Sequence, residues 1–332
     1  MRTDHPMSQG SSSPAKASDM PILRKAKTVL RISYTLPFVL ASLTGVAFGL
    51  TRADNLVLGI LIVSDVFVLS LFANLSNDYF DHKSGADKTR FSNDDPEFRE
   101  AAWKIMGNKV YWEGNSFDIG YLSERTGKII LTLLAAAAVG MGVPIILLGG
   151  FVVIPLGLIA LFLSYFYTAP PLNLGARGLG ELDVLASFTC MSFFSYFIVH
   201  PVFDVEMLMI SLAVGIAVFM MRLVDEMTGY QAHVAAKEKD LCVRLGLEGA
   251  VRLESYVLVV FYVVVASLSL FNLTYLMLFL TLVPAFKIVK FLGDKQDRFR
   301  FIRPVFETLK VAIGTEILII LALSAQTVLT YL

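Results

Sequence analysis

The chain has 332 residues, of which 56% are apolar and only 17% are charged, and its mean hydropathy is +0.67. This composition excludes an ordinary water-soluble globular domain. The 28 basic and 28 acidic side chains give a net charge of zero, which excludes a global positive field that would recruit nucleic acid. The two cysteines, Cys190 and Cys242, are too few for a disulfide framework or a thiolate metal cage.

Residues 1–22 are expected to form a disordered cytoplasmic tail, because their Ser, Pro and small polar residues bury too little apolar surface to fold. Residues 23–332 are expected to form one helical domain. This domain contains a series of apolar stretches. Their lengths are close to the roughly 20 residues that a helix needs to cross a bilayer. We count nine of them, at about 28–50, 55–77, 128–147, 151–168, 182–200, 205–224, 253–271, 273–292 and 307–330.

The charge of the loops predicts the orientation of these spans, because Lys and Arg accumulate on the cytoplasmic side. With nine spans and the N-terminus inside, 27 of the 28 basic residues fall inside and only Arg52 falls outside. The sequence therefore predicts an all-α, polytopic bundle of nine transmembrane helices with its N-terminus in the cytoplasm. The long loops are on the inner side, so the functional site is expected on the cytoplasmic face.

The first polar segment with a chemical pattern is residues 74–87, at the inner end of the second span. Asn74, Asp78 and Asp81 recur at helical spacing and share one face, and Asp87 follows shortly after. Oxygen ligands of this kind suit Mg²⁺, which completes its shell with substrate phosphate oxygens. Acidic residues beside a membrane span usually mark a substrate or ion site. The alternative is a solvated helix end that Asn and Asp cap.

A second polar loop, residues 222–246, follows the sixth span. Asp225 and Glu226 lie at the helix end, and Lys239 and Arg244 come after them. Two acidic helix ends that face each other across a bundle can hold one diphosphate through bridging Mg²⁺, while basic residues neutralise the remaining oxygens. The alternative is an ordinary charged cytoplasmic loop.

A third segment, residues 165–183, joins the fourth and fifth spans, and its paired prolines break the helix. Tyr165 and Tyr167 can place aromatic faces beside a developing cation, and Arg177 can meet a phosphate. The alternative is that both tyrosines are ordinary residues of the membrane interface.

Four motifs in these segments can be compared with known families. They are Arg31 with Thr35-Leu36-Pro37; an aspartate motif of Asn74, Asn77, Asp78, Asp81, Gly85 and Asp87; YTAPPLNLGARGLGE from Tyr167; and VRLG from Val243. Together they resemble the UbiA superfamily of intramembrane prenyltransferases, and most closely its 1,4-dihydroxy-2-naphthoate polyprenyltransferase (menaquinone) branch. The resemblance extends from about Arg31 to the C-terminus.

The resemblance implies a helical bundle around a central cavity that opens to lipid, with Mg²⁺ and an isoprenyl diphosphate donor bound at the cytoplasmic side. The expected metal ligands are Asp78, Asp81, Asp87, Asp225 and Glu226. The residues expected to contact the diphosphate are Asn74, Asn77, Lys239, Arg244, Arg177 and Arg31. The expected catalytic residues are Asp78, Asp81, Tyr167 and Asp225. Ionisation of an allylic diphosphate requires neutralisation of the leaving group and a pocket that excludes water.

The second motif departs from the family pattern. Counted back from VRLG, two aspartates of that pattern fall on Gly229 and His233, and a glycine falls on Lys237. Imidazole is a poor ligand for Mg²⁺, and a lone histidine in a charged loop is expected to be solvated. A neutral metal ligand and a base are the alternatives for His233.

The predicted function is Mg²⁺-dependent prenyl transfer to an aromatic acceptor, with 1,4-dihydroxy-2-naphthoate or a related quinone precursor as the first candidate. Other lipophilic acceptors stay open: an ether-lipid glycerol phosphate, a tetrapyrrole or a carotenoid. A non-catalytic isoprenoid-binding paralogue stays open as well. A transporter is disfavoured, because the acidic residues cluster at one membrane face rather than at the midplane.

Overall fold

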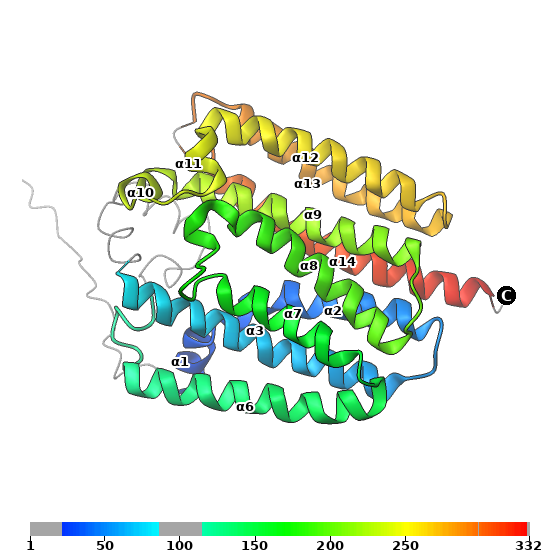
Figure 1. The fold of residues 1–332 in the computed structure, drawn as a ribbon. Coiled ribbons are helices and arrows are strands. Elements are labelled where there is room, and N and C mark those ends of the chain that lie inside the picture. Colours follow the sequence, from blue (N-terminus) through cyan, green and yellow to red (C-terminus); the bar gives the residue numbers. More distant parts are fainter. Residues whose placement is uncertain (1–21, 86–114, 298, 331–332) are drawn as a thin grey trace, which may run out of the picture.

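The computed structural model describes residues 22–85, 115–297 and 299–330. The described residues form helices joined by turns, with no strand among them. Figure 1 shows the long helices side by side and running alternately in opposite directions. The predicted tail lies almost wholly outside the described residues, and so does Asp87.

The helical elements follow the predicted apolar stretches in order. They are α1 (Ile22–Val29), η2 (Ile32–Thr35), α2 (Leu36–Leu50), α3 (Leu56–Ser84), α6 (Glu124–Gly149), α7 (Val153–Phe166), η4 (Gly175–Leu179), α8 (Gly180–Val199), α9 (Val205–Thr228), α10 (Tyr230–Ala235), α11 (Leu241–Leu245), α12 (Leu247–Leu268), η5 (Leu273–Thr281), α13 (Leu282–Gly293) and α14 (Ile302–Thr330).

Eight helical segments of the described chain are long and apolar enough to cross a membrane. The expected all-helical membrane bundle is therefore confirmed. The remaining apolar helix, α7, has 14 residues. At 1.5 Å per residue it extends about 21 Å, which is shorter than a hydrocarbon core of about 30 Å. The count of nine crossing helices and the cytoplasmic N-terminus stay predictions.

Helix α9 is central to the core, because it packs against α8, α12 and α14. Helices α2 and α8 approach so closely that a Cβ on Gly45 would lie 2.0 Å from the carbonyl oxygen of Ser192. Ser42 and Ser195 join the same two helices by a hydrogen bond of 2.9 Å. Small residues and hydroxyl pairs of this kind are the usual basis of tight helix packing in membranes.

One end of the bundle carries the polar segments. Figure 1 shows α10 and α11 at the same end as the last turn of α3 and the first turn of α6, with the C-terminus at the opposite end. The turn before α8 is in backbone contact with the segment between α10 and α11. Gly178 has a φ of 79°, and a Cβ there would lie 2.0 Å from the carbonyl oxygen of Lys239. The three polar segments predicted from the sequence therefore meet at this end.

Candidate active site

The first acidic motif occupies the last turns of α3, and its central residue is ion-paired. Asp78 is only 2% exposed, and its Oδ1 lies 2.5 Å from Nη2 of Arg31. Arg31 has a positive φ of 47°, at the turn between α1 and η2. Non-glycine residues held in such a conformation are often found at functional sites. The unusual backbone conformation therefore occurs at the residue whose guanidinium group pairs with Asp78.

The amide residues of this motif connect α3 to two other segments. The Thr168 hydroxyl donates a hydrogen bond of 2.8 Å to Oδ1 of Asn77, and this bond ties the motif to the turn after α7. Nδ2 of Asn74 lies 3.5 Å from the carbonyl oxygen of Arg31. Asp81 is partly exposed one turn beyond Asp78. The last turns of α3 therefore present both acids and both amides close to the end of the bundle.

Tyr34 relates the two acidic motifs to each other. Its hydroxyl lies within electrostatic range of Arg31, Asp78 and Asp225. Asp78 belongs to α3 and Asp225 to α9, so the charges of both acidic motifs act on the same phenol. Tyr34 was not among the residues predicted for the site. Its position one helical turn after Arg31 was the available signal.

In the second motif, two neighbouring acids have different surroundings. The side chain of Asp225 is 29% exposed, with its Oδ2 3.2 Å from Nη1 of Arg222. The side chain of Glu226 is 3% exposed and is ion-paired through Oε1 with Nη2 of Arg222. Sequence reasoning missed Arg222, although it precedes the two acids at the i, i+3 and i+4 spacing of a helical ion pair. Asp225 is accessible to a ligand, whereas Glu226 points into the protein.

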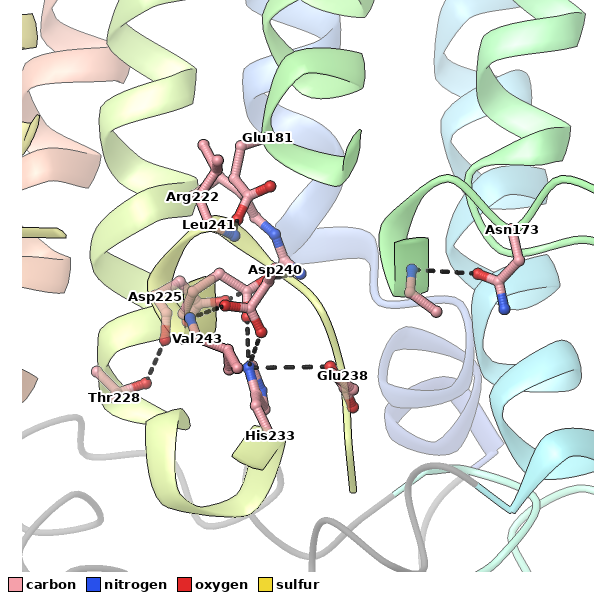
Figure 2. A network of polar contacts seen from close by, with 12 residues as sticks. Asn173, Glu181, Arg222, Asp225, Thr228, His233, Glu238, Asp240, Leu241 and Val243 are labelled. Carbon is pink, nitrogen blue, oxygen red and sulfur yellow. Dashed lines mark hydrogen bonds and ion pairs between the residues drawn. The ribbon is translucent and has the colours of Figure 1, made fainter. Parts of the chain in front are cut away.

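The loop after α9 folds back toward the end of that helix, and Figure 2 shows His233 and Asp240 next to each other there. Nδ1 of His233 lies 2.7 Å from Oε2 of Glu226 and 3.0 Å from Oδ2 of Asp240, and all three residues are buried. The expectation that His233 is solvated is therefore wrong. The reason is tertiary: α10 begins directly after Gly229, and this tight turn returns the imidazole to the helix it has just left.

Asp240 belongs to this cluster and was also missed. Its Oδ1 accepts a hydrogen bond of 2.7 Å from the backbone N–H of Val243 and so caps α11. An Asp just before a short helix is the sequence signal for such a cap. The cap fixes the carboxylate, and its second oxygen faces His233.

Tyr167 follows α7, and charged residues at the end of α9 act on it. Burial raises the pKa of its phenol well above the ordinary value, against the opposing charge of Arg222, and Glu226, Glu181 and Asp183 add to the rise. A raised pKa favours the protonated hydroxyl, which can donate a hydrogen bond. What Tyr167 offers a substrate is an aromatic face and a hydrogen-bond donor.

Three of the predicted basic residues lie where the turn before α8 meets the segment from α10 to α11. The exposed Arg177 donates to the carbonyl oxygen of Pro171 at 2.8 Å, and the exposed Arg244 donates to the carbonyl oxygen of Arg177 at 2.7 Å. Lys239 is exposed beside them, with its backbone against Gly178. The remaining predicted basic residue, Arg31, is instead paired with the first motif.

Comparison with known proteins identifies the family. Residues 119–301, more than half of the chain, match the UbiA prenyltransferase family. The chain belongs to this family. Within it, the 2-carboxy-1,4-naphthoquinone phytyltransferase of Synechocystis sp. is 28% identical over 242 residues, which cover 71% of each chain. The expected resemblance is thus confirmed, and the protein is a prenyltransferase and an integral, multi-pass membrane protein.

Solved structures of UbiA proteins share the fold. A UbiA homolog from Archaeoglobus fulgidus bound to GPP and Mg²⁺ superposes with a TM-score of 0.61 at 16% identity, covering 89% of this chain and 99% of that chain. A structure of digeranylgeranylglyceryl phosphate synthase superposes with a TM-score of 0.57 at 13% identity, covering 91% and 98%.

The residues of the UbiA prenyltransferase differ in how well they suit Mg²⁺. The carboxylates of Asp78, Asp81 and Asp225 supply hard oxygen donors, which fit this cation. The cluster around His233 contains a nitrogen donor and does not fit it. Glu226 is the predicted magnesium ligand for which the structure offers another role, because it faces Arg222 and His233.

Proposed function

We propose that this UbiA protein transfers a prenyl group from an isoprenyl diphosphate to an aromatic acceptor of the dihydroxynaphthoate type. The reaction takes place at the end of the bundle where α3 and α9 present their acids, on the cytoplasmic side. The observation that carries the proposal is that the charges of Asp78 and Asp225, from two different helices, both act on the hydroxyl of Tyr34.

Magnesium, when bound, supplies the positive charge that stabilises the departing diphosphate. Asp78, Asp81 and Asp225 are the described residues proposed to hold it. Asp87 is proposed as a further ligand on the basis of the motif alone. Asn74 and Asn77 orient the first motif, since the hydrogen bond from Thr168 to Asn77 fixes the helix end against the neighbouring turn.

The diphosphate oxygens that the metal leaves uncovered require further donors. Arg177 on the turn before α8, Lys239 between α10 and α11, and Arg244 in α11 form an exposed basic group and are proposed to contact them. Arg31 is paired with Asp78 and is proposed to contact the diphosphate from the other side. Guanidinium groups suit this task because their planar N–H groups match phosphate oxygens.

The isoprenoid chain requires an apolar path beside the acidic end. A groove of about 440 Å³ lies between α3 and α7 and is lined by Phe72, Leu158, Leu161, Phe162, Tyr165 and Phe166. We propose this groove for the chain of the donor. Tyr165 belongs both to the groove and to the segment that leads to Tyr167, whose aromatic face is proposed to stabilise the allylic cation.

The acceptor class is proposed from the naphthoquinone relative. The test uses purified protein in nanodiscs with Mg²⁺, labelled geranylgeranyl diphosphate, and two acceptors: 1,4-dihydroxy-2-naphthoate and a glycerol phosphate ether-lipid precursor. We expect a prenylated naphthoate that disappears with EDTA and falls at least about 100-fold in Asp78→Asn and Asp225→Asn. Glu316→Gln is the matched control, because it changes a buried carboxyl group in α14 and leaves the acidic motifs of α3 and α9 intact.

Product from the glycerol phosphate alone would reassign the acceptor and keep the chemistry. Donor binding without product from either acceptor would contradict the proposed enzyme activity and favour an isoprenoid-binding role. Equal activity of Asp225→Asn and Glu316→Gln would refute the assignment of the second motif.

A further inference from the structure

A second group of potential ligands lies behind the acidic end of α9. Glu226, His233 and Asp240 each offer one ligand atom, and these atoms lie within 4.8 Å of one another. The three residues come from three elements: the last turns of α9, α10, and the residue that caps α11. All three are buried, which distinguishes them from solvated acids of a surface loop.

The distances between these atoms suit a cation that forms short metal–ligand bonds. Nδ1 of His233 lies 2.7 Å from one carboxylate oxygen and 3.0 Å from the other. Ligands at about 2.0 to 2.1 Å from a tetrahedral Zn²⁺ are about 3.3 Å apart, so a small outward movement of the three groups accommodates the ion. Oε2 of Glu238 lies 3.9 Å from the same nitrogen and can supply a fourth ligand.

The donor set also selects the class of cation. One imidazole nitrogen and two carboxylate oxygens suit Zn²⁺, Mn²⁺ or Co²⁺, whereas Mg²⁺ prefers oxygen alone. Asp240 is held in place by its Oδ1, which caps α11. Glu226 is held by its ion pair with Arg222. Such outer contacts orient the ligands of a metal site.

The local backbone makes room for the imidazole. A Cβ on Gly229 would lie 2.6 Å from Nε2 of His233 and 3.1 Å from its Cε1. The ring therefore occupies space that a side chain at residue 229 would take. This places the ring with Nδ1 toward the two carboxylates and Nε2 toward Gly229.

We propose that Glu226, His233 and Asp240 form a structural site for a borderline divalent cation of the Zn²⁺ class, which ties the end of α9 to α10 and α11. This site uses other residues than the diphosphate site proposed at Asp78 and Asp225. The cation fixes the segment from α10 to α11, which carries Lys239 and Arg244, so it organises the basic side of the active site without contacting the substrate.

The test is the binding of Co²⁺, as a spectroscopic probe of the Zn²⁺ class, to the full chain in detergent. The protein carries a purification tag without histidine, is stripped with EDTA, and is kept in excess Mg²⁺ so that the oxygen sites are filled. Bound cobalt is counted by elemental analysis, and its visible absorption reports nitrogen and oxygen coordination. Thermal unfolding with and without Co²⁺ gives a second measurement.

The wild-type chain is expected to bind one Co²⁺ and to unfold at a higher temperature with it. His233→Gln and Asp240→Asn are expected to lose at least about tenfold in affinity and to lose the thermal shift. Asp240→Asn keeps a side-chain oxygen that can cap α11, so it preserves the fold if the histidine variant does not. His200→Gln is the matched histidine control, because His200 lies at the C-terminal end of α8, whereas the turn beside Lys239 precedes its N-terminal end. This variant is expected to retain binding.

Three outcomes would overturn the proposal. The first is a wild-type chain that binds no Co²⁺ in excess Mg²⁺. The second is a folded His233→Gln or Asp240→Asn chain that binds Co²⁺ as the wild type does. The third is loss of the bound Co²⁺ in Asp78→Asn, since this would place the ion at the diphosphate site. None of these outcomes depends on prenyl transfer.

Discussion

Gly229 and His233 are matched to each other, because a Cβ on the glycine would meet the imidazole at 2.6 Å. Gly229 has a φ of −91°, which any residue can adopt, so the requirement for glycine is one of space. Counted back from VRLG, these are the two positions where the resemblance to the family leads us to expect aspartates. The absence of a side chain at residue 229 leaves room for the buried imidazole of His233.

Replacement of this glycine tests the match. Gly229→Ala is expected to destabilise the protein by about 1 to 3 kcal/mol, because the imidazole is held by Glu226 and Asp240 and cannot move aside freely. Chemical denaturation in detergent measures the effect. Gly142→Ala is the control, since a Cβ there meets nothing within 4 Å. Equal stability of the two variants would show that the ring does not need this space.

The ion pair between Arg31 and Asp78 leads to a prediction on donor affinity. Arg31→Ala is expected to raise the KM for the isoprenyl diphosphate at least about tenfold, because it removes a charged partner of the first motif and a proposed phosphate donor. Steady-state kinetics at saturating Mg²⁺ measures this change. Arg52→Ala is the control, because Arg52 pairs with Asp204 and Glu206 away from the site. A KM that is unchanged in Arg31→Ala would remove Arg31 from the site.

The role proposed for Tyr167 depends on its aromatic ring and not on its hydroxyl group. Tyr167→Phe keeps the aromatic face and is expected to keep kcat within about threefold of the wild type, whereas Tyr167→Leu is expected to lower kcat about 30-fold. The larger effect corresponds to a desolvated cation and ring interaction of about 2 kcal/mol. Single-turnover rates of prenyl transfer distinguish the two variants. A Phe variant as slow as the Leu variant would assign the role to the hydroxyl.

The sequence predicts the helices and the active end better than it predicts side-chain contacts. Apolar length locates the spans, and the fourth expected span, 151–168, becomes α7 at Val153–Phe166. Loop charge and motif position place the acidic segments at one end, as the structure does. These features depend on local composition, which a single sequence displays directly.

The contacts that the sequence did not predict depend on the path of the chain after α9. The neighbours Asp225 and Glu226 were expected to act together, yet helical geometry turns one outward and the other into the protein. His233 was expected in solvent, yet the turn at Gly229 brings it back to Glu226. Asp240 joins them from beyond the next turn, and no spacing rule connects residues that meet through a loop.

The central claim is that Asp78 and Asp225 act on one diphosphate through Mg²⁺. It is tested most directly by the affinity for a non-hydrolysable geranylgeranyl diphosphate analogue in the wild type, Asp78→Asn, Asp225→Asn and the double variant, each with and without Mg²⁺. We predict that binding depends on Mg²⁺ and that the double variant loses at least about 1 kcal/mol less than the sum of the two single losses. Binding that does not require Mg²⁺, or losses that simply add, would contradict the claim.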